Sequence, residues 1–260
     1  MRLEKNNNEA AFMSKSVFIT GASSGLGRQV AGEFAKRGYD LALAARQLDV
    51  LHLIKSELEA QHGVRVLVYP LDVSDTGQIR ETLTAASAEL GKLDIVVANA
   101  GLGHDGRIGR IDFANSRQMF EVNVIGACAT IDAAITLFKH QGHGQIVAMS
   151  SIASWRGLPG SAAYSASKAA VSVYMEALRA ETQGKGKSLA VTVIYPGYID
   201  TPMNNKLKHR PFLLSLEEGG KRITDAIVQR RKRAVIPGYP WLLLRPLLQL
   251  LPTALIGKLF

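Results

Sequence analysis

The stretch Ser16-Val-Phe-Ile-Thr20-Gly21-Ala22-Ser23-Ser24-Gly25-Leu26-Gly27 decides the fold of this chain. Its first five residues form a mostly apolar run that is typical of a buried strand, and glycines follow at once. Val30 and Phe34 continue in helical phase until Gly38, and Asp40-Leu-Ala-Leu-Ala-Ala45 then indicates a second strand. The segment therefore predicts a strand, a helix and a second strand in succession.

The same alternation continues along most of the chain. Periodicity predicts further helices over 48–62, 76–90, about 116–140, 162–182 and 221–228, and further strands over 64–69, 93–98, 145–150, 189–195 and 234–237. This order predicts an α/β fold of three layers, with a doubly wound, seven-stranded parallel sheet between helices. Ligands bind beyond the carboxyl ends of the strands in such sheets, so the residues that follow each strand are the candidates for function.

Length and composition indicate one large domain. The chain has 260 residues, 47% of them hydrophobic, and its single Cys128 excludes an intramolecular disulfide and a cysteine-cluster metal site. We expect a flexible tail over 1–13, one domain over 14–238 with a pocket lid at about 199–220, and an apolar tail over 239–260. The first nine residues contain no apolar run, so we expect no signal peptide and a cytoplasmic protein.

The glycine turn after the first strand predicts a phosphate site. Glycines permit positive φ and close approach of the backbone, while free N–H groups at the helix start and the hydroxyls of Ser23 and Ser24 can bind a pyrophosphate. An ordinary glycine-rich turn is the alternative. The position between the first strand and the first helix favours the phosphate site, although the spacing departs from the general Gly-x-Gly-x-x-Gly pattern.

The end of the second strand bears on which dinucleotide would bind. Dinucleotide folds commonly place an acid there for the ribose hydroxyl, whereas this chain has Ala45 and Arg46. A planar cation suits a ribose phosphate, so NADP is favoured over NAD, with a surface arginine as the alternative. Asp72 and Val73, after the third strand, could hold the adenine.

Tyr164 and Lys168 are spaced for acid–base chemistry. Four residues apart on a helix, they share one face, and a nearby ammonium would lower the pKa of the phenol. A surface tyrosine beside a solvated lysine is the other interpretation. Ser150 and Ser151 end a strand at the same edge of the sheet, where a hydroxyl can bond a carbonyl oxygen or cap the strand. Asn123 is a polar residue in an apolar helix, with either a structural role or a place in a proton path.

Taken together and in order, these motifs resemble the short-chain dehydrogenase/reductase family in its single-domain form. The resemblance covers about 14–203 and rests on the joint order of Thr20–Gly27, Asn99-Ala100-Gly101, Asn123, Ser151, Tyr164-x-x-x-Lys168 and Pro196-Gly197. It implies a Rossmann fold and a homodimer or homotetramer that pairs through the long helices starting at Ser116 and Ala162.

The resemblance also implies roles for individual residues. Tyr164 would be the general acid/base, Lys168 would tune it and hold the nicotinamide ribose, Ser151 would orient the carbonyl, and Asn123 would hold a relay water. Ser151 is preferred over Ser150 because it lies thirteen residues before Tyr164, as in the family. The implied cofactor-binding residues are Gly21, Ser23, Ser24, Gly25, Leu26, Gly27, Arg46, Asp72, Val73, Asn99, Ala100, Gly101, Tyr164, Lys168, Pro196, Gly197, Ile199 and Thr201.

No metal is expected in this chemistry. His104, His140 and His143 lie in loop-like settings without ligand spacing and are interpreted as solvated residues.

The net charge of +9 lies in the last part of the chain: residues 185–260 hold 13 Lys and Arg but only 4 Asp and Glu. Lys206-Leu-Lys-His-Arg-Pro211 resembles a lid whose cations could attract an acidic substrate, with a solvated loop as the alternative. The leucine-rich tail that begins at Trp241 is interrupted by Pro246 and Pro252, and is too short to span a membrane. It would either pack on protein or lie on an anionic membrane surface. The basic stretch lacks interleaved aromatic residues, so nucleic acid is not an expected partner.

The sequence thus predicts an NADP(H)-dependent oxidoreductase that transfers a hydride between nicotinamide and a carbonyl or secondary alcohol. An apolar or lipid-like small molecule is the expected substrate. Two alternatives stay open: a 3-oxoacyl-thioester reductase, and a scaffold that binds the cofactor without catalysis.

Overall fold

The computed structural model describes residues 14–182, 188–207 and 209–259, and the predicted flexible tail at 1–13 lies outside them. Within these residues one parallel sheet has the strand order β3-β2-β1-β4-β5-β6-β7. The strands are β1 (Ser16–Thr20), β2 (Asp40–Ala45), β3 (Val66–Pro70), β4 (Ile95–Ala98), β5 (His143–Met149), β6 (Ser188–Pro196) and β7 (Arg233–Ile236). This confirms the predicted fold class. The strand order reverses between β1 and β4, which is where such sheets bind ligands.

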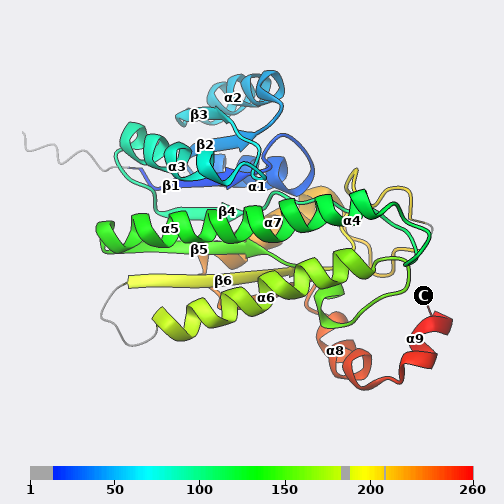
Figure 1. Cartoon of the computed structure of the whole chain (residues 1–260). Helices are drawn as coiled ribbons and strands as arrows, with labels where there is room; N and C mark the ends of the chain where they lie inside the picture. Colours follow the sequence, from blue (N-terminus) through cyan, green and yellow to red (C-terminus); the bar gives the residue numbers. More distant parts are fainter. Residues whose placement is uncertain (1–13, 183–187, 208, 260) are drawn as a thin grey trace, which may run out of the picture.

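Helices cover both faces of the sheet (Figure 1). One face carries α1 (Gly25–Ala35), α2 (Leu48–His62) and α7 (Leu216–Val228), and the other carries α3 (Thr76–Leu90), α5 (Ala127–Gln141) and α6 (Ala162–Thr182). A helix α4 (Phe113–Phe120) leads through the π-helical turn η1 (Glu121–Gly126) into α5, and a short 3₁₀ turn η2 (Ile152–Trp155) follows β5. Two further helices, α8 (Trp241–Leu250) and α9 (Thr253–Leu259), end the described chain.

Two predicted helix starts were wrong because capping side chains begin the helices earlier. The Ser215 hydroxyl accepts a hydrogen bond from the Glu218 N–H at 3.2 Å, so α7 starts at Leu216 rather than at Lys221. The predicted lid at 199–220 therefore overlaps a helix at its end. Similarly, the Asp112 carboxylate accepts from the Ala114 N–H at 2.9 Å, and the helix predicted from Ser116 starts at Phe113.

The helical run Phe113–Gln141 is long and apolar enough to cross a membrane by length and composition, and it is the only such run among the described residues. Only part of its apolar surface belongs to the core. Ile131, Ala134 and Phe138 are buried against the sheet, whereas Phe113, Phe120 and Ile125, nearer its start, are exposed.

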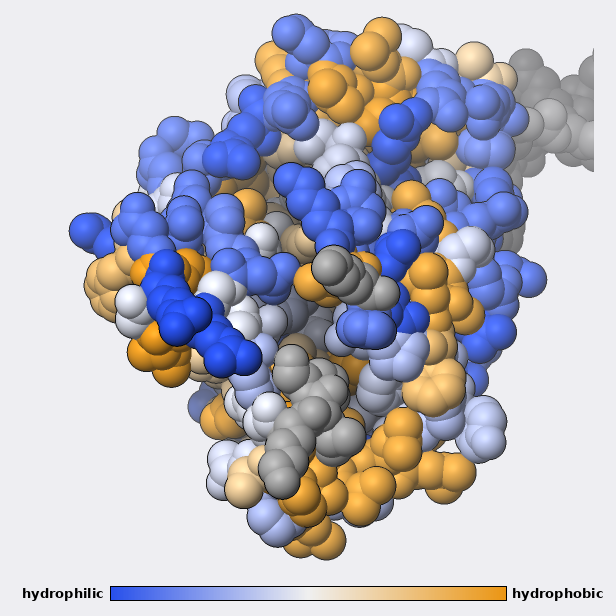
Figure 2. Space-filling model, turned by 90° about the vertical axis from the view of Figure 1, so that its right-hand side faces the viewer, coloured by the Kyte–Doolittle hydropathy of each residue, from blue (hydrophilic) through white to orange (hydrophobic). Residues whose placement is uncertain are grey.

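The helices α8 and α9 form the end of the described chain, apart from the layered body. They lie at the lower end of the molecule in Figure 1, and Figure 2 shows hydrophobic residues gathered at the lower end of the adjoining face. Pro246 lies inside α8 without ending it. The apolar tail predicted at 239–260 is thus helical over most of its length.

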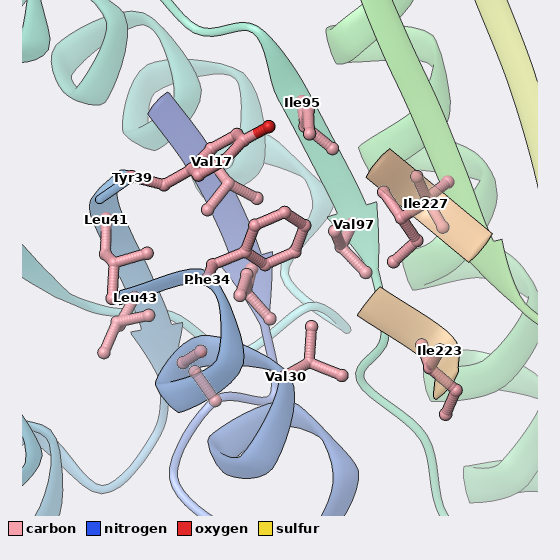
Figure 3. Packing of buried hydrophobic residues seen from close by; sticks show 14 of the residues in the cluster. Val17, Val30, Phe34, Tyr39, Leu41, Leu43, Ile95, Val97, Ile223 and Ile227 are labelled. Carbon is pink, nitrogen blue, oxygen red and sulfur yellow. The ribbon is translucent and has the colours of Figure 1, made fainter. Parts of the chain in front are cut away.

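Alternation along the central strands divides the core into two halves. In β1, Val17 and Ile19 point to the side of α1 and α7, whereas Phe18 points to the side of α3 and α5. Figure 3 shows the first half, where the Phe34 ring of α1 packs among apolar side chains of the strands and of α7. Because α1 follows the glycine turn directly, this packing also sets where the turn lies.

Truncation of Phe34 should cost much of the stability of the fold. Its side chain is fully buried, and a buried Phe→Ala change typically costs about 3–5 kcal/mol. Urea unfolding of Phe34→Ala against Leu53→Ala, a residue of α2 that is 72% exposed, measures the difference. Equal unfolding midpoints would show that α1 is not held by this core.

Candidate active site

The glycine turn is built for close approach between backbone segments. Gly21 and Gly25 have positive φ, +67° and +52°, which favours glycine at both positions. A Cβ on Gly27 would lie only 2.2 Å from the carbonyl oxygen of Gly21, so a side chain there would open the turn. These contacts explain the glycines of the motif physically.

Hydrogen bonds tie this turn to the end of β4. The Asn99 amide donates to the Thr20 and Gly21 carbonyl oxygens at 2.8 and 3.2 Å. In return, the Thr20 hydroxyl accepts from the N–H groups of Asn99 and Ala100 at 3.0 and 3.1 Å. Asn99 therefore holds the turn in place, a role that its position after a strand did not reveal.

A cavity of about 550 Å³ lies along the carboxyl ends of the strands. All of the predicted cofactor-binding residues line it, from the glycine turn through Arg46 and Asp72 to Thr201, and so does Ser151. The structure thus brings together residues that lie up to 180 positions apart, at the place where the fold binds ligands. Asn123 is the one predicted site residue that does not line the cavity.

The two serines after β5 have different surroundings. The Ser150 hydroxyl bonds the Lys168 carbonyl oxygen at 2.9 Å and the Ser172 hydroxyl at 2.7 Å, so it holds β5 to α6. The Ser151 hydroxyl caps η2 by accepting from the Ala153 N–H at 3.1 Å, and it donates to the Pro196 carbonyl oxygen at 3.4 Å. Both serines line the cavity, but only Ser150 holds β5 to α6 in this way.

Tyr164 and Lys168 lie together on α6, as their spacing predicted. The Lys168 ammonium is 5.9 Å from the centre of the Tyr164 ring, and it donates to the Met149 carbonyl oxygen at 2.9 Å. Its side chain is buried, and burial lowers the pKa of Lys168 to about 8.

The predicted lowering of the tyrosine pKa was wrong for this structure. Burial raises the pKa of Tyr164 above its ordinary value, and the charge of Asp105 raises it further, while the hydrogen bond with Ser151 acts in the opposite direction. The phenol is therefore protonated at neutral pH.

Asn123 does not line the cavity but is hydrogen-bonded to residues next to it. It lies in η1 and is fully buried, where its side chain accepts from the Leu102 N–H at 2.7 Å and donates to the Leu102 carbonyl oxygen at 2.9 Å. Its amide also donates to the Ser167 hydroxyl at 3.1 Å, which in turn donates to the Tyr164 carbonyl oxygen. Asn123 thus links the loop after β4 to the turn of α6 that carries Tyr164. Ser167 is a member of this network that sequence reasoning missed.

A second, smaller cavity of about 140 Å³ adjoins the first. Ser151, Tyr164 and Gly197 line both, so the candidate reacting groups stand at the junction. Three loop segments line it, through Gly103 and Asp105, through Trp155, Arg156 and Leu158, and through Tyr198, Met203, Asn204 and Leu207. Trp241 and Leu248 of α8 also line it, which no local pattern had shown.

The basic lid segment contributes less free charge than expected. The Arg210 guanidinium pairs with the Asp200 carboxylate and bonds the Asn204 side chain, and Leu207 lines the smaller cavity. Lys208 lies outside the described residues. An attraction of this segment for acidic substrates therefore has little support from Arg210.

The three histidines were predicted to be solvated residues in loops, and the structure agrees only in part. His140 is exposed but lies in α5, while His143 begins β5 with its ring nitrogen 3.8 Å from the Asp94 carboxylate. His104 is partly buried. Among residues 14–182, 188–207 and 209–259, no group of three or more His, Cys, Asp or Glu side chains is placed to hold a metal ion.

The comparison with known families agrees with this geometry: short chain dehydrogenases match residues 15–211. The chain belongs to the short chain dehydrogenase family. As a short chain dehydrogenase, it is an oxidoreductase with a nucleotide-binding Rossmann fold.

Relatives of this short chain dehydrogenase extend over nearly its whole length. An uncharacterized oxidoreductase of Mycobacterium tuberculosis is 37% identical over 246 residues, which are 94% of this chain and 96% of that protein. The structure of an alcohol dehydrogenase of the archaeon Thermococcus sibiricus, in complex with 5-hydroxy-NADP, is 30% identical, with a TM-score of 0.75 over 85% of this chain and 94% of that one. A short-chain dehydrogenase/reductase of Mycobacterium marinum is 28% identical, with a TM-score of 0.79 over 88% and 96%.

Burial of Lys168 should make stability depend on pH. Its pKa is about 8 in the folded protein against 10.5 ordinarily, so the unfolded chain holds the proton more tightly and stability rises with pH between these values. We expect the wild type to gain about 2 kcal/mol relative to Lys168→Met between pH 7 and pH 10. Urea unfolding of both proteins across this range measures the gain, and parallel pH curves would contradict it.

Proposed function

We propose that this protein is an NADP(H)-dependent reductase of a carbonyl group, or a dehydrogenase of the corresponding secondary alcohol. One observation carries the proposal: Ser151 and Tyr164 stand where a cavity with the predicted dinucleotide-binding residues meets a smaller cavity with apolar walls. A substrate carbonyl at this junction would reach both hydroxyl groups. A scaffold that only binds the cofactor would have no need of this arrangement.

The protein side of the reaction is a proton transfer. When bound, the reduced cofactor supplies a hydride from nicotinamide C4 to the carbonyl carbon. Tyr164, protonated because burial raises its pKa, gives its proton to the carbonyl oxygen, while the Ser151 hydroxyl orients that oxygen. The protonated phenol is the form that can donate a proton in the reduction.

Lys168 lines the larger cavity, and its amine lies close to the Asn123 side chain. Its Nζ lies near Gly101, where an added Cβ would be 3.3 Å from both the Lys168 amine and the Asn123 side-chain oxygen. In the proposed reaction the ammonium binds the nicotinamide ribose and stabilises the phenolate that remains after proton transfer. Asn123 acts through the Leu102 backbone and Ser167, so it is a positioning residue.

The preference for NADP rests on the end of β2. Ala45 stands where an acid would repel a ribose phosphate, and the Arg46 side chain is 61% exposed at the cavity rim. Its guanidinium is 3.9 Å from the Asp72 carboxylate, a separation that leaves its donors free to rotate toward a phosphate. The 5-hydroxy-NADP complex of the related archaeal enzyme is consistent with this choice.

The smaller cavity favours an apolar substrate. Its walls are mostly hydrophobic or aromatic, including Trp155, Leu158, Leu207, Trp241 and Leu248. A 3-oxoacyl-thioester reductase stays the alternative on the strength of the basic charge, and dependence of turnover on an acyl carrier would distinguish it.

Removal of one hydroxyl tests the chemistry. We expect Tyr164→Phe to lower kcat for NADPH-driven carbonyl reduction at least about a thousandfold, because the phenol is the only proton donor proposed, while the Kd for NADPH changes little. Tyr174→Phe removes an exposed phenol from the same helix and is the matched control. The assay runs aliphatic, aromatic, steroid and thioester carbonyls with NADPH and with NADH. Turnover retained in Tyr164→Phe would remove Tyr164 from its role.

Neutralising Arg46 tests the cofactor preference. We expect Arg46→Ala to weaken NADPH binding roughly tenfold or more and NADH binding little, since only NADPH carries the phosphate. Arg65→Ala removes an equal charge from an exposed position next to β3 and serves as control. Equal weakening of the two cofactors by Arg46→Ala would show that Arg46 does not contact the phosphate.

A further inference from the structure

Helix α8 exposes apolar side chains to solvent and turns its charged side chain toward the protein. Its outward side chains Leu242, Leu243, Leu247 and Leu250 are 55%, 68%, 56% and 83% exposed, whereas its single charged residue, Arg245, is turned toward the protein. A surface helix in water normally shows the opposite distribution. The outward leucines of α8, with Tyr239 before it and Leu255 of α9, are called the leucine face below; they are all exposed.

The inward side of α8 packs against Gly197 and against residues of and just after η2, and these contacts fix the orientation of the helix. Trp241 is buried with its indole against Gly197, and the Arg245 guanidinium lies 5.4 Å from the centre of the Trp155 ring. The Arg156 guanidinium donates to the carbonyl oxygens of Gln249 and Leu251 at 2.9 and 2.8 Å, which caps the carboxyl end of α8. These contacts set the leucines outward.

The charged side chains around α8 are mostly basic, with Asp105, which lines the same cavity as α8, as an acidic exception. The chain has no Asp or Glu after Asp225. Lys206 and His209 are exposed beside Leu207, which lines the same cavity as α8. In contrast, the basic run at 230–233 lies at the amino end of β7, where Arg233 pairs with Glu176, whereas α8 follows the carboxyl end of the same strand. The overall charge of the last 76 residues is therefore divided between two ends of the molecule, and only part of it lies near α8.

We propose that the leucine face is a membrane-contact surface that lies among the acyl chains at the surface of an anionic bilayer. Lys206 and His209 would lie at the level of the head groups. Figure 2 shows the hydrophobic residues of this end next to hydrophilic residues higher on the same face, which is the arrangement that such contact needs.

A bilayer fits this face better than a second copy of the chain. Another exposed apolar set, Phe113, Phe120, Ile125, Val173 and Tyr174, lies on α4, η1 and α6. These helices offer an apolar surface separate from α8, so pairing of two subunits through them would not require the leucine face. Moreover, its surface is made of leucine side chains without outward charges, and a liquid hydrocarbon makes no demand for complementary shape.

The position of α8 connects this contact to the substrate. Outward residues of the helix face the proposed bilayer, while Trp241 and Leu248 of the same helix line the apolar cavity. An apolar carbonyl dissolved in the bilayer would have a short path to Tyr164. This last step rests on the proposed function, whereas the lipid contact does not.

Vesicle flotation tests the contact directly. The wild type, Leu243→Glu/Leu247→Glu, and the control Leu53→Glu/Val228→Glu are floated with phosphatidylcholine vesicles that contain or lack 30% phosphatidylglycerol. Both variants change the net charge equally, and the control sites are exposed residues of α2 and α7. We expect the wild type and the control to float with anionic vesicles, and the partition coefficient of the α8 variant to fall at least tenfold.

The other outcomes overturn the proposal. Equal flotation of all three proteins, or no flotation of the wild type, would exclude a lipid contact through α8. If the wild type does not float, and light scattering shows that the α8 variant forms smaller oligomers than the wild type, the leucine face would be assigned to contact with a second copy of the chain. Thermal unfolding and NADPH binding of the variants show that they are folded.

Activity measurements separate this proposal from the proposed function. The α8 variant should keep its turnover of a water-soluble carbonyl and lose turnover of a long-chain carbonyl supplied in vesicles. If the wild type floats but reduces neither substrate, the contact stands and the proposed reaction fails. If both substrates are reduced equally by wild type and variant, the path through the bilayer is wrong.

Discussion

The exchange of hydrogen bonds between Thr20 and Asn99 is the constraint on which the rest of the site depends. β1 and β4 are the strands between which the sheet order reverses, and their ends must be held at a set separation for a ligand to lie across them. The Asn99 amide satisfies carbonyl oxygens of the glycine turn that would otherwise lie unpaired inside the protein. Gly21 and Gly27 keep side chains out of the space that this approach requires. The glycine turn is thus held by hydrogen bonds from two side chains, Thr20 and Asn99, to backbone groups.

The second half of the site is organised around α6. Ser150, Ser167 and Lys168 are all buried, and each has a hydrogen bond to backbone or to a neighbouring polar side chain. A buried amine without a fixed carboxylate partner is costly, and the lowered pKa of Lys168 shows that cost. Such an arrangement is typical of a group retained for chemistry, since a hydrophobic side chain of similar size would be cheaper at this position.

The C-terminal helix α8 both packs on the η2 turn and lines the smaller cavity. Arg156, directly after η2, caps α8, and Arg245 of α8 lies over Trp155 of η2. The η2 turn after β5 and helix α8 are therefore joined by reciprocal arginine contacts. A change of sequence in α8 can alter the smaller cavity and the outward leucines together, because residues of this ten-residue helix contribute to both.

The sequence by itself determined the fold class and the seven strands, because these depend on local periodicity. Local spacing also singled out Tyr164 with Lys168 and the pair Ser150 and Ser151, whereas the choice of Ser151 and the full set of predicted cofactor-binding residues came from the resemblance to the short-chain dehydrogenase/reductase family. Only the tertiary structure decided the pKa of Tyr164, the separate surroundings of Ser150 and Ser151, and the contribution of Trp241 to the pocket. Burial, hydrogen-bond partners and contacts between distant segments arise when the chain packs, so no pattern along the sequence carries them. For the same reason, the sequence shows that the residues after Trp241 are apolar, but not which way they face. Their outward direction depends on the contact with Arg156, some ninety residues away.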